Sequence, residues 1–155
     1  MAIELVREHF KKYGLDYKIM EYEASSATVD LAARALGVEP ERMAKTLSFR
    51  NDDGCILVVA AGDAKIDNAK FKHKFRMKAK MLTPDEVLAK VGHAVGGVCP
   101  LMVYPACGSS NSAIELTCDE IFTYANGQEW VDVCKGWQKD LDLKNDDLSY
   151  KISSH

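Results

Sequence analysis

Several features that would define other classes of protein are absent from this 155-residue sequence. No apolar run approaches the roughly 18 residues of a membrane-spanning helix, and residues 1–8 are amphipathic rather than typical of a signal peptide. The five cysteines contain no CxxC pair and are odd in number, which argues against a disulfide framework and against a zinc knuckle. No internal repeat or linker divides the chain. These absences favour a single domain in a reducing, cytoplasmic compartment, with no metal or other cofactor.

The composition is that of an ordinary globular protein, but the charge is unevenly distributed. With 47% hydrophobic and 28% charged residues, a chain of this length can bury a hydrophobic core without needing disulfides or metal sites for stability. The net charge is −3, yet residues 65–80 carry seven cations against one acid, a local +6 that leaves −9 for the remaining residues. The cations are Lys65, Lys70, Lys72, Lys74, Arg76, Lys78 and Lys80, and the acid is Asp67. A lysine run is usually a solvated face, but a basic patch on an otherwise acidic protein would attract a polyanion such as RNA.

Hydrophobic periodicity and capping residues predict an α+β domain. Helices are expected over residues 2–13, 28–36, 67–75 and 84–91, with one helical turn around Pro40. Strands are expected at 17–23, 44–50, 55–61, 77–81, 101–104 and 114–116, and a further hairpin at 121–124 and 129–133 around Asn126-Gly127. The strand at 55–61 is apolar throughout, so it should be central and covered on both faces. Together the elements predict a mixed, mostly antiparallel sheet flanked by helices.

Residues 92–100, which follow the last predicted helix and end at Pro100, are where chemistry is most expected. The adjacent glycines Gly96 and Gly97 expose bare backbone, and successive N–H groups in such a turn can converge into a nest for an anion or a carbonyl oxygen. Cys99 adds a polar, reactive side chain. From the glycines alone, a surface turn between two elements is the simpler interpretation.

Two motifs in this chain point to a known family. Lys45-Thr46-Leu47 opens a predicted hairpin, and Gly96 and Pro100 form a Gly-x-x-x-Pro loop later in the sequence. In this order, with matching helices between them, they resemble the YbaK/prolyl-tRNA-synthetase-associated editing domains, which are free-standing or inserted aminoacyl-tRNA deacylases. The resemblance covers roughly residues 5–135. It implies a curved, barrel-like, YbaK-like sheet in one editing domain over residues 1–138, followed by a polar C-terminal tail, 139–155.

The resemblance assigns roles to individual residues. Lys45 matches the family's functional lysine, and Gly96 and Pro100 match its Gly-x-x-x-Pro loop. By spacing, Tyr22 matches a tyrosine that closes the first strand, and Asp132 matches an aspartate that follows the last hairpin. The residues expected to bind the substrate are Tyr22, His93, Val98, Cys99, Pro100 and Asp132.

The sequence departs from the family pattern at Cys99, where a serine is usual, and at Met102, where a glycine is common. Both departures bear on amino-acid specificity more than on activity. An alternative makes Cys99 a nucleophile with His93 as its base. Nothing in the sequence supplies the orienting partner that such a pair needs, so His93 is expected to be a hydrogen-bonded wall of the pocket.

The chemistry implied by the resemblance is hydrolysis of an activated ester, which needs positioning and charge stabilisation more than a strong nucleophile. The N–H groups of Gly96 and Gly97 would hold the ester carbonyl or the developing oxyanion, and Lys45 would bind phosphate or ribose of the terminal adenosine. The resemblance also implies that the substrate's own groups, such as the ribose 2′-hydroxyl, take part, which explains why no Ser-His-Asp set is visible. Without the resemblance, Lys45 is more simply a solvent-facing strand lysine.

The resemblance therefore implies a trans-editing hydrolase that deacylates a mischarged aminoacyl-tRNA, with tRNA(Pro) carrying Cys, Ala or a similar small residue as the expected substrate. Lys70, Lys72 and Lys74 of the basic run are expected to contact the tRNA acceptor end. A non-catalytic module that binds tRNA or a synthetase through the same pocket is the alternative. Prolyl-tRNA synthetase is the protein partner that the resemblance admits, and a monomer without DNA or membrane partners is expected.

Overall fold

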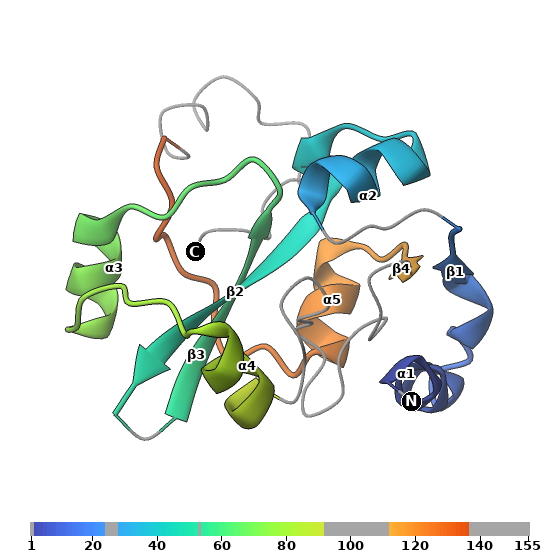
Figure 1. Ribbon diagram of the computed structural model, residues 1–155, viewed down its shortest axis with the longest axis horizontal. Coiled ribbons are helices and arrows are strands. Elements are labelled where there is room, and N and C mark those ends of the chain that lie inside the picture. Colours follow the sequence, from blue (N-terminus) through green and yellow to red (C-terminus); the bar gives the residue numbers. More distant parts are fainter. Residues whose placement is uncertain (1, 24–27, 53, 92–111, 137–155) are drawn as a thin grey trace.

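The computed structural model describes residues 2–23, 28–52, 54–91 and 112–136, which form a mixed α+β fold. In chain order the elements are α1 (Ala2–Lys11), the 3₁₀ helix η1 (Asp16–Lys18), β1 (Ile19–Glu21), α2 (Val29–Leu36), the 3₁₀ helix η2 (Pro40–Arg42), β2 (Ala44–Asn51), β3 (Gly54–Ala61), α3 (Asn68–Phe75), α4 (Pro84–Val91), β4 (Ser112–Ile114) and α5 (Cys118–Tyr124). Figure 1 shows the β2–β3 hairpin between α3 on one side and α5, β4, β1 and α1 on the other. Within these ranges no helix has the length and hydropathy to cross a lipid bilayer.

Local capping signals place the helices where the sequence predicts them. Thr28 is the N-cap of α2, and Gly37 ends that helix in the left-handed region at φ 66°. Asp67 caps α3 with its side chain. Thr83 and Glu86 form a capping box at the start of α4, because each side chain accepts a hydrogen bond from the other residue's N–H. The four predicted helices and the helical turn after α2 are confirmed.

The first predicted hairpin is confirmed, but its central strand among the described residues is β2 and not β3. β2 pairs with β3 along one edge. Along its other edge, Arg50 N–H donates to the Lys80 carbonyl at 2.8 Å, and Leu82 N–H donates to the Ser48 carbonyl at 3.1 Å. In the described part of the chain β3 pairs only with β2. The strand expected at 77–81 is reduced to this short contact, with a single β-bridge at its end.

The prediction that β3 is covered on both faces is confirmed. Val58 lies on one face in a cluster with Phe49 of β2 and Phe71 of α3, whose ring centroids are 4.6 Å apart. Leu57, on the opposite face, packs against the cluster that contains Val87 of α4. The apolar residues of β3 are therefore explained by helices on either side of the hairpin.

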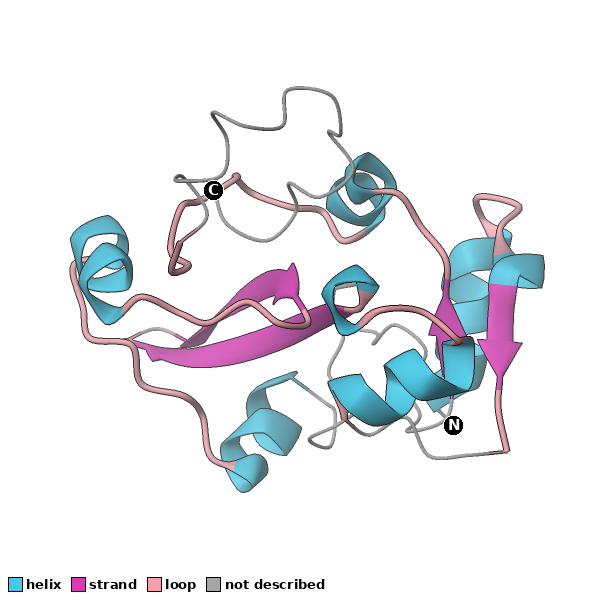
Figure 2. Ribbon diagram, turned by 90° about the horizontal axis from the view of Figure 1, so that it is seen from above, coloured by secondary structure: helices cyan, strands magenta, loops and turns pink. Residues whose placement is uncertain are grey.

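A second, smaller core lies at the N-terminal end of the chain. Val6 and Phe10 of α1 pack with Ile19 of β1, and Tyr124 of α5 contacts Phe10 edge-to-face at a centroid distance of 6.0 Å. β1 pairs antiparallel with β4, and Figure 2 shows this short sheet apart from the β2–β3 hairpin. The described strands thus form two separate two-stranded sheets, without the closure of a barrel. The strand expected at 101–104 lies outside the described residues.

The second predicted hairpin, around Asn126-Gly127, is wrong, because its first half is the helix α5. Thr117 and Glu120 form a complete capping box at the start of this helix. Asn126 adopts φ 51°, and Gly127 N–H donates to the Phe122 carbonyl at 2.8 Å, as in a Schellman motif. An Asn-Gly pair supplies a positive φ to a hairpin turn and to a helix C-terminus alike, so the capping box decides between the two.

Candidate functional site

Lys45 is the predicted site residue whose surroundings the structure defines best. It is the second residue of β2, opposite Ala60 of β3, and its side chain is half-buried. Its ammonium donates a hydrogen bond to the Gly62 carbonyl at 2.9 Å and another to the Ala64 carbonyl. An ammonium has three N–H donors, and the described residues accept two of them, so the third can meet a ligand. The side chain is thus held by the backbone that follows β3.

Burial and neighbouring charges set the electrostatics of this lysine. Desolvation lowers the pKa of the Lys45 ammonium, and this is the largest effect on it. Electrostatic interactions with Cys134 and with the Asp63 carboxylate raise that pKa, while the cation of Lys65 lowers it. A cation that is partly withdrawn from water and bound to neutral carbonyls is screened less than an exposed one, so it attracts an anionic group more strongly.

The segment that holds Lys45, residues 62–67, is itself fixed by the last described part of the chain. Asp67 N–H donates to the Val133 carbonyl at 2.8 Å, and Lys135 N–H donates to the Lys65 carbonyl at 2.9 Å. These antiparallel contacts support the Gly62 and Ala64 carbonyls, because the segment that carries them is hydrogen-bonded to a neighbour at Lys65 and Asp67.

Asp132, which the resemblance assigns to substrate binding, forms a salt bridge with Lys70 of α3. The Lys70 ammonium lies 2.8 and 3.1 Å from the two carboxylate oxygens, and it also donates to the Cys134 carbonyl at 3.0 Å. The two side chains are 31% and 25% exposed. Lys70 therefore joins α3 to the segment that supports residues 62–67.

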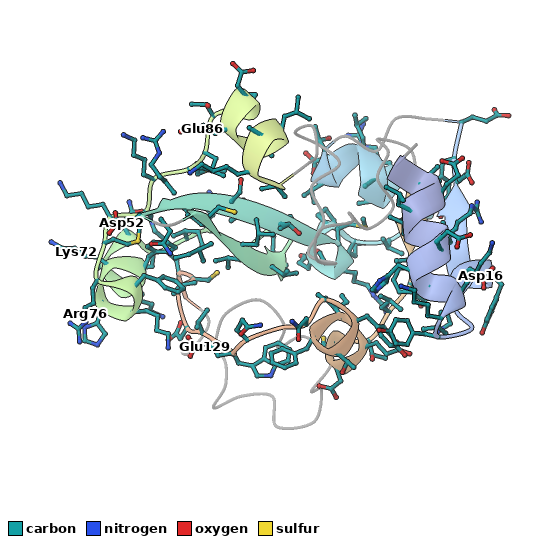
Figure 3. All side chains as sticks on the ribbon, turned by 90° about the horizontal axis from the view of Figure 1, so that it is seen from below. Asp16, Asp52, Lys72, Arg76, Glu86 and Glu129 are labelled. Atoms are coloured by element: carbon teal, nitrogen blue, oxygen red, sulfur yellow. The ribbon has the colours of Figure 1, made fainter. Side chains whose placement is uncertain are left out.

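The other two lysines predicted to contact tRNA lie in different environments. Lys74 forms a salt bridge with Glu129 at 2.6 Å. Lys72 is exposed, and Figure 3 shows it on the outer side of α3, away from the segment that carries Glu129. The three lysines therefore differ: Lys70 and Lys74 are paired with carboxylates of the protein, whereas Lys72 faces solvent.

A shallow surface pocket of about 520 Å³ lies against α3, lined by Ala69, Lys70, His73, Lys74 and Asp132. Its rim combines two cations with one carboxylate, and His73 is exposed. In the part of the chain that the structure describes, no group of three or more His, Cys, Asp or Glu side chains is arranged to hold a metal ion.

The remaining predicted site residues divide into one that is described and six that are not. Tyr22 follows β1, is half-buried, and donates from its hydroxyl to the Met20 sulfur at 3.2 Å. The predicted loop residues His93, Gly96, Gly97, Val98, Cys99 and Pro100 lie outside the described residues. The structure therefore unites Lys45 with the segment after β3, and Asp132 with Lys70.

Sequence reasoning did not anticipate the carbonyls of Gly62 and Ala64 as partners of Lys45. They lie 17 and 19 residues from it in the chain. The available signal was the register of the hairpin, which places the end of β3 beside the start of β2. That signal indicates proximity, but it does not say which way a lysine side chain turns.

Comparison with known proteins gives a consistent family. A family model described as an aminoacyl-tRNA editing domain matches residues 23–121. The uncharacterized protein YwhH of Bacillus subtilis (strain 168) is 46% identical over 157 residues, which span 89% of this chain and all of YwhH. The proline–tRNA ligase of Thermotoga sp. (strain RQ2) is 32% identical over 77 residues, which span 49% of this chain and 13% of the ligase. The crystal structure of a candidate trans-editing enzyme for prolyl tRNA synthetase superposes with a TM-score of 0.73 at 25% identity, covering 87% of this chain and 98% of the other.

Proposed function

The chain belongs to the YbaK-type family of aminoacyl-tRNA editing domains, and from that premise we propose that it is a trans-editing hydrolase that deacylates a mischarged aminoacyl-tRNA. The observation that carries the proposal is the ammonium of Lys45, which two backbone carbonyls hold in place and whose third N–H no described residue accepts. The local similarity to proline–tRNA ligases and the candidate trans-editing structure support tRNA(Pro) as the nucleic acid, with Cys, Ala or a similar small residue as the amino acid removed.

In the proposed reaction, water adds to the ester carbonyl, the bond to the ribose oxygen breaks, and the proton from water goes to that oxygen. Lys45 binds phosphate or ribose of the terminal adenosine and places the ester in the pocket. The N–H groups of Gly96 and Gly97 stabilise the oxyanion that develops on the carbonyl oxygen. The ribose 2′-hydroxyl assists the attacking water, so that no nucleophile from the protein is required.

The amino-acid side chain is proposed to lie against Tyr22, His93, Val98, Cys99, Pro100 and Asp132. For Asp132, the salt bridge to Lys70 supports an indirect contribution, through the segment that fixes residues 62–67. Val98, Cys99 and Pro100 are small and mainly apolar, so their part of the pocket is proposed to select by size, and one methylene changes binding by about 1–3 kcal/mol. Cys99, in place of the usual serine, is therefore a specificity residue in this proposal.

Among the three lysines proposed to contact the tRNA acceptor end, Lys72 is the best supported, because it is exposed on the outer side of α3. Lys70 and Lys74 are bound to Asp132 and Glu129, so each would have to exchange a carboxylate for a phosphate. That exchange costs free energy that a solvated lysine does not lose. Prolyl-tRNA synthetase remains the proposed protein partner, and the proposed form of the protein is a cytoplasmic monomer.

The proposal is tested by deacylation rates on a panel of mischarged tRNAs, with cysteinyl-, alanyl- and seryl-tRNA(Pro) first. Lys45→Ala should lose about a hundredfold or more in rate, because loss of substrate positioning by even about 1 Å has an effect of that order. Lys45→Arg should also be impaired, because the planar guanidinium does not replace a compact ammonium. Lys12→Ala, which removes an exposed lysine directly after α1, is the matched control. A wild-type protein that binds these tRNAs without hydrolysing them would instead be the non-catalytic binding module.

The tRNA surface has its own test, based on salt dependence. Lys72→Glu should weaken binding and reduce the slope of log affinity against log salt by about one unit for each phosphate that the protein no longer neutralises. Lys12→Glu makes the same change of charge on a different surface and should leave the slope unchanged. Equal slopes of log affinity against log salt for the two variants would mean that Lys72 does not contact tRNA and that α3 presents only a solvated charged face.

A further inference from the structure

Gly62, the residue directly after β3, lies where no other residue fits. A Cβ atom built on Gly62 would be 2.1 Å from the Pro40 carbonyl oxygen and 2.5 Å from Val29 Cγ1. Real Cβ atoms essentially never approach another heavy atom within 3.0 Å, so the backbone would have to shift by about 0.9 Å or more at the Pro40 contact. Gly62 is not among the glycines with positive φ. The requirement for glycine is therefore one of space and not of backbone conformation.

The same residue contributes one of the two acceptors of Lys45. The Gly62 carbonyl accepts from the Lys45 ammonium at 2.9 Å, and the Ala64 carbonyl, two residues further, accepts a second hydrogen bond. Ala64 N–H donates to the Ala61 carbonyl at 3.0 Å, so a tight turn joins the two acceptors to the end of β3. Any shift of Gly62 therefore moves the groups that hold the ammonium.

The segment cannot yield freely on its other side. Asp67 and Lys65 are hydrogen-bonded to Val133 and Lys135, so residues 62–67 are held between η2 on one side and residues 133–135 on the other. A close-packed interior transmits such a displacement because it has few voids to absorb it. The position of the Gly62 and Ala64 carbonyls is therefore set by how closely Gly62 approaches Pro40.

We propose that Gly62 is a positioning residue for Lys45: the missing side chain lets the segment after β3 lie against η2, and this places the two carbonyls that aim the ammonium. The inference rests on the proposed function in one respect only, that the ammonium binds the terminal adenosine and so places the aminoacyl ester. The placement of Lys45 by Gly62 can be measured without any catalytic activity.

The test compares Gly62→Ala with Gly54→Ala. Gly54 is at the opposite end of β3, and a Cβ built on it meets nothing within 4 Å, so this variant makes the same chemical change without a clash. In both proteins and in the wild type, a small amine-reactive reagent labels the lysines across a range of pH, and mass spectrometry reads the rate at Lys45. The wild-type rate at high pH should be well below that of exposed Lys12, and Gly62→Ala should raise it toward that of Lys12. Gly54→Ala should match the wild type.

Deacylation supplies the second readout. Misplacement of the substrate by about 1 Å costs on the order of a hundredfold, so Gly62→Ala should lower kcat/KM for the mischarged tRNA by about that factor. A merely structural role would lower the amount of active protein without changing the labelling of Lys45 in the folded fraction. Unchanged labelling of Lys45 in folded Gly62→Ala overturns the positioning role, whatever the activity.

Two further outcomes are distinguishable. If labelling changes as expected but the wild type deacylates no tRNA in the panel, the proposed function fails and the placement of Lys45 by Gly62 stands. If Gly62→Ala does not fold, the double variant Val29→Ala/Gly62→Ala removes the 2.5 Å contact, so that only the Pro40 carbonyl has to yield. Faster labelling of Lys45 in the double variant than in Val29→Ala alone supports the proposal, and equal labelling overturns it.

Discussion

Replacing Asp132 by Asn removes one charge from a salt bridge that joins two segments 62 residues apart in the chain. The substitution keeps the volume of the side chain, so its effect comes from the bond to Lys70 and not from a cavity. Hydrogen bonds to charged groups contribute about 1.5–3 kcal/mol when sheltered, whereas exposed ion pairs contribute about 0.2–1 kcal/mol. With side chains 25% and 31% exposed, Asp132→Asn should lower the free energy of unfolding by about 1–2 kcal/mol.

The salt bridge between Lys74 and Glu129 is a control within the same protein. Its side chains are 38% and 55% exposed, and it links α3 to the same stretch of chain. Glu129→Gln should therefore cost less than about 1 kcal/mol. Urea unfolding at fixed pH measures both variants, and a double-mutant cycle with Lys70→Met isolates the coupling between Lys70 and Asp132.

The same variants separate a structural from a substrate-binding role for Asp132. If the carboxylate acts through Lys70, Asp132→Asn lowers the free energy of unfolding, and the double-mutant cycle shows that Lys70 and Asp132 stabilise the protein more together than separately. The reasoning is refuted if Asp132→Asn is no more destabilising than Glu129→Gln. A raised KM for mischarged tRNA with unchanged stability would show that Asp132 contacts the substrate directly, as the resemblance implies.

Three further predictions concern other parts of the chain. The hydrogen bond from Arg50 is the main reason that the pKa of Glu86 falls from 4.5 to about 2. The contribution of ionised Glu86 to the free energy of unfolding is therefore complete above pH 4.5 and lost as pH falls through about 2. The difference in urea midpoint between the wild type and Glu86→Gln should narrow over that range. Thr117→Ala removes the capping box of α5 and should cost about 1 kcal/mol in urea unfolding, against little change for the exposed Thr123→Ala control; equal costs would contradict the capping argument. Cys99→Ser should retain deacylation within about tenfold and shift amino-acid preference, whereas a thousandfold loss or a trapped acyl-Cys99 adduct would make the thiol a nucleophile.

Elements that depend on residues a few positions apart were predictable from the sequence. Thr28 and Gly37 define the two ends of α2, and Thr83 with Glu86 defines the start of α4. These signals are local hydrogen bonds or a local need for positive φ, so they act wherever the segment lies in the fold. The family resemblance, which also rests on short motifs, led to the correct family for the same reason, and Lys45 stays a prediction of that resemblance.

The failure at Asn126-Gly127 marks where local information becomes ambiguous. Both a hairpin turn and a helix C-terminus accept this pair, and strand-like residues precede it. The helix is stabilised by the capping box and by packing of Tyr124 against Phe10, a residue of α1. The capping box is a local signal that outweighs the Asn-Gly pair, and the contact with Phe10 adds packing that only the tertiary structure supplies.

What the sequence determined by itself was the family, the α+β class and a lysine-rich stretch at residues 65–80. The tertiary structure decided how those charges are used: it neutralises Lys70 and Lys74 with carboxylates, leaves Lys72 exposed, and turns Lys45 toward the carbonyls after β3. Hydrogen bonds and ion pairs form between groups a few ångströms apart in space, whatever their separation in the chain. A count of charged residues gives the number of cations in the sequence. Folding brings carboxylates and carbonyls to some of these cations, and this decides which of them can still bind a substrate.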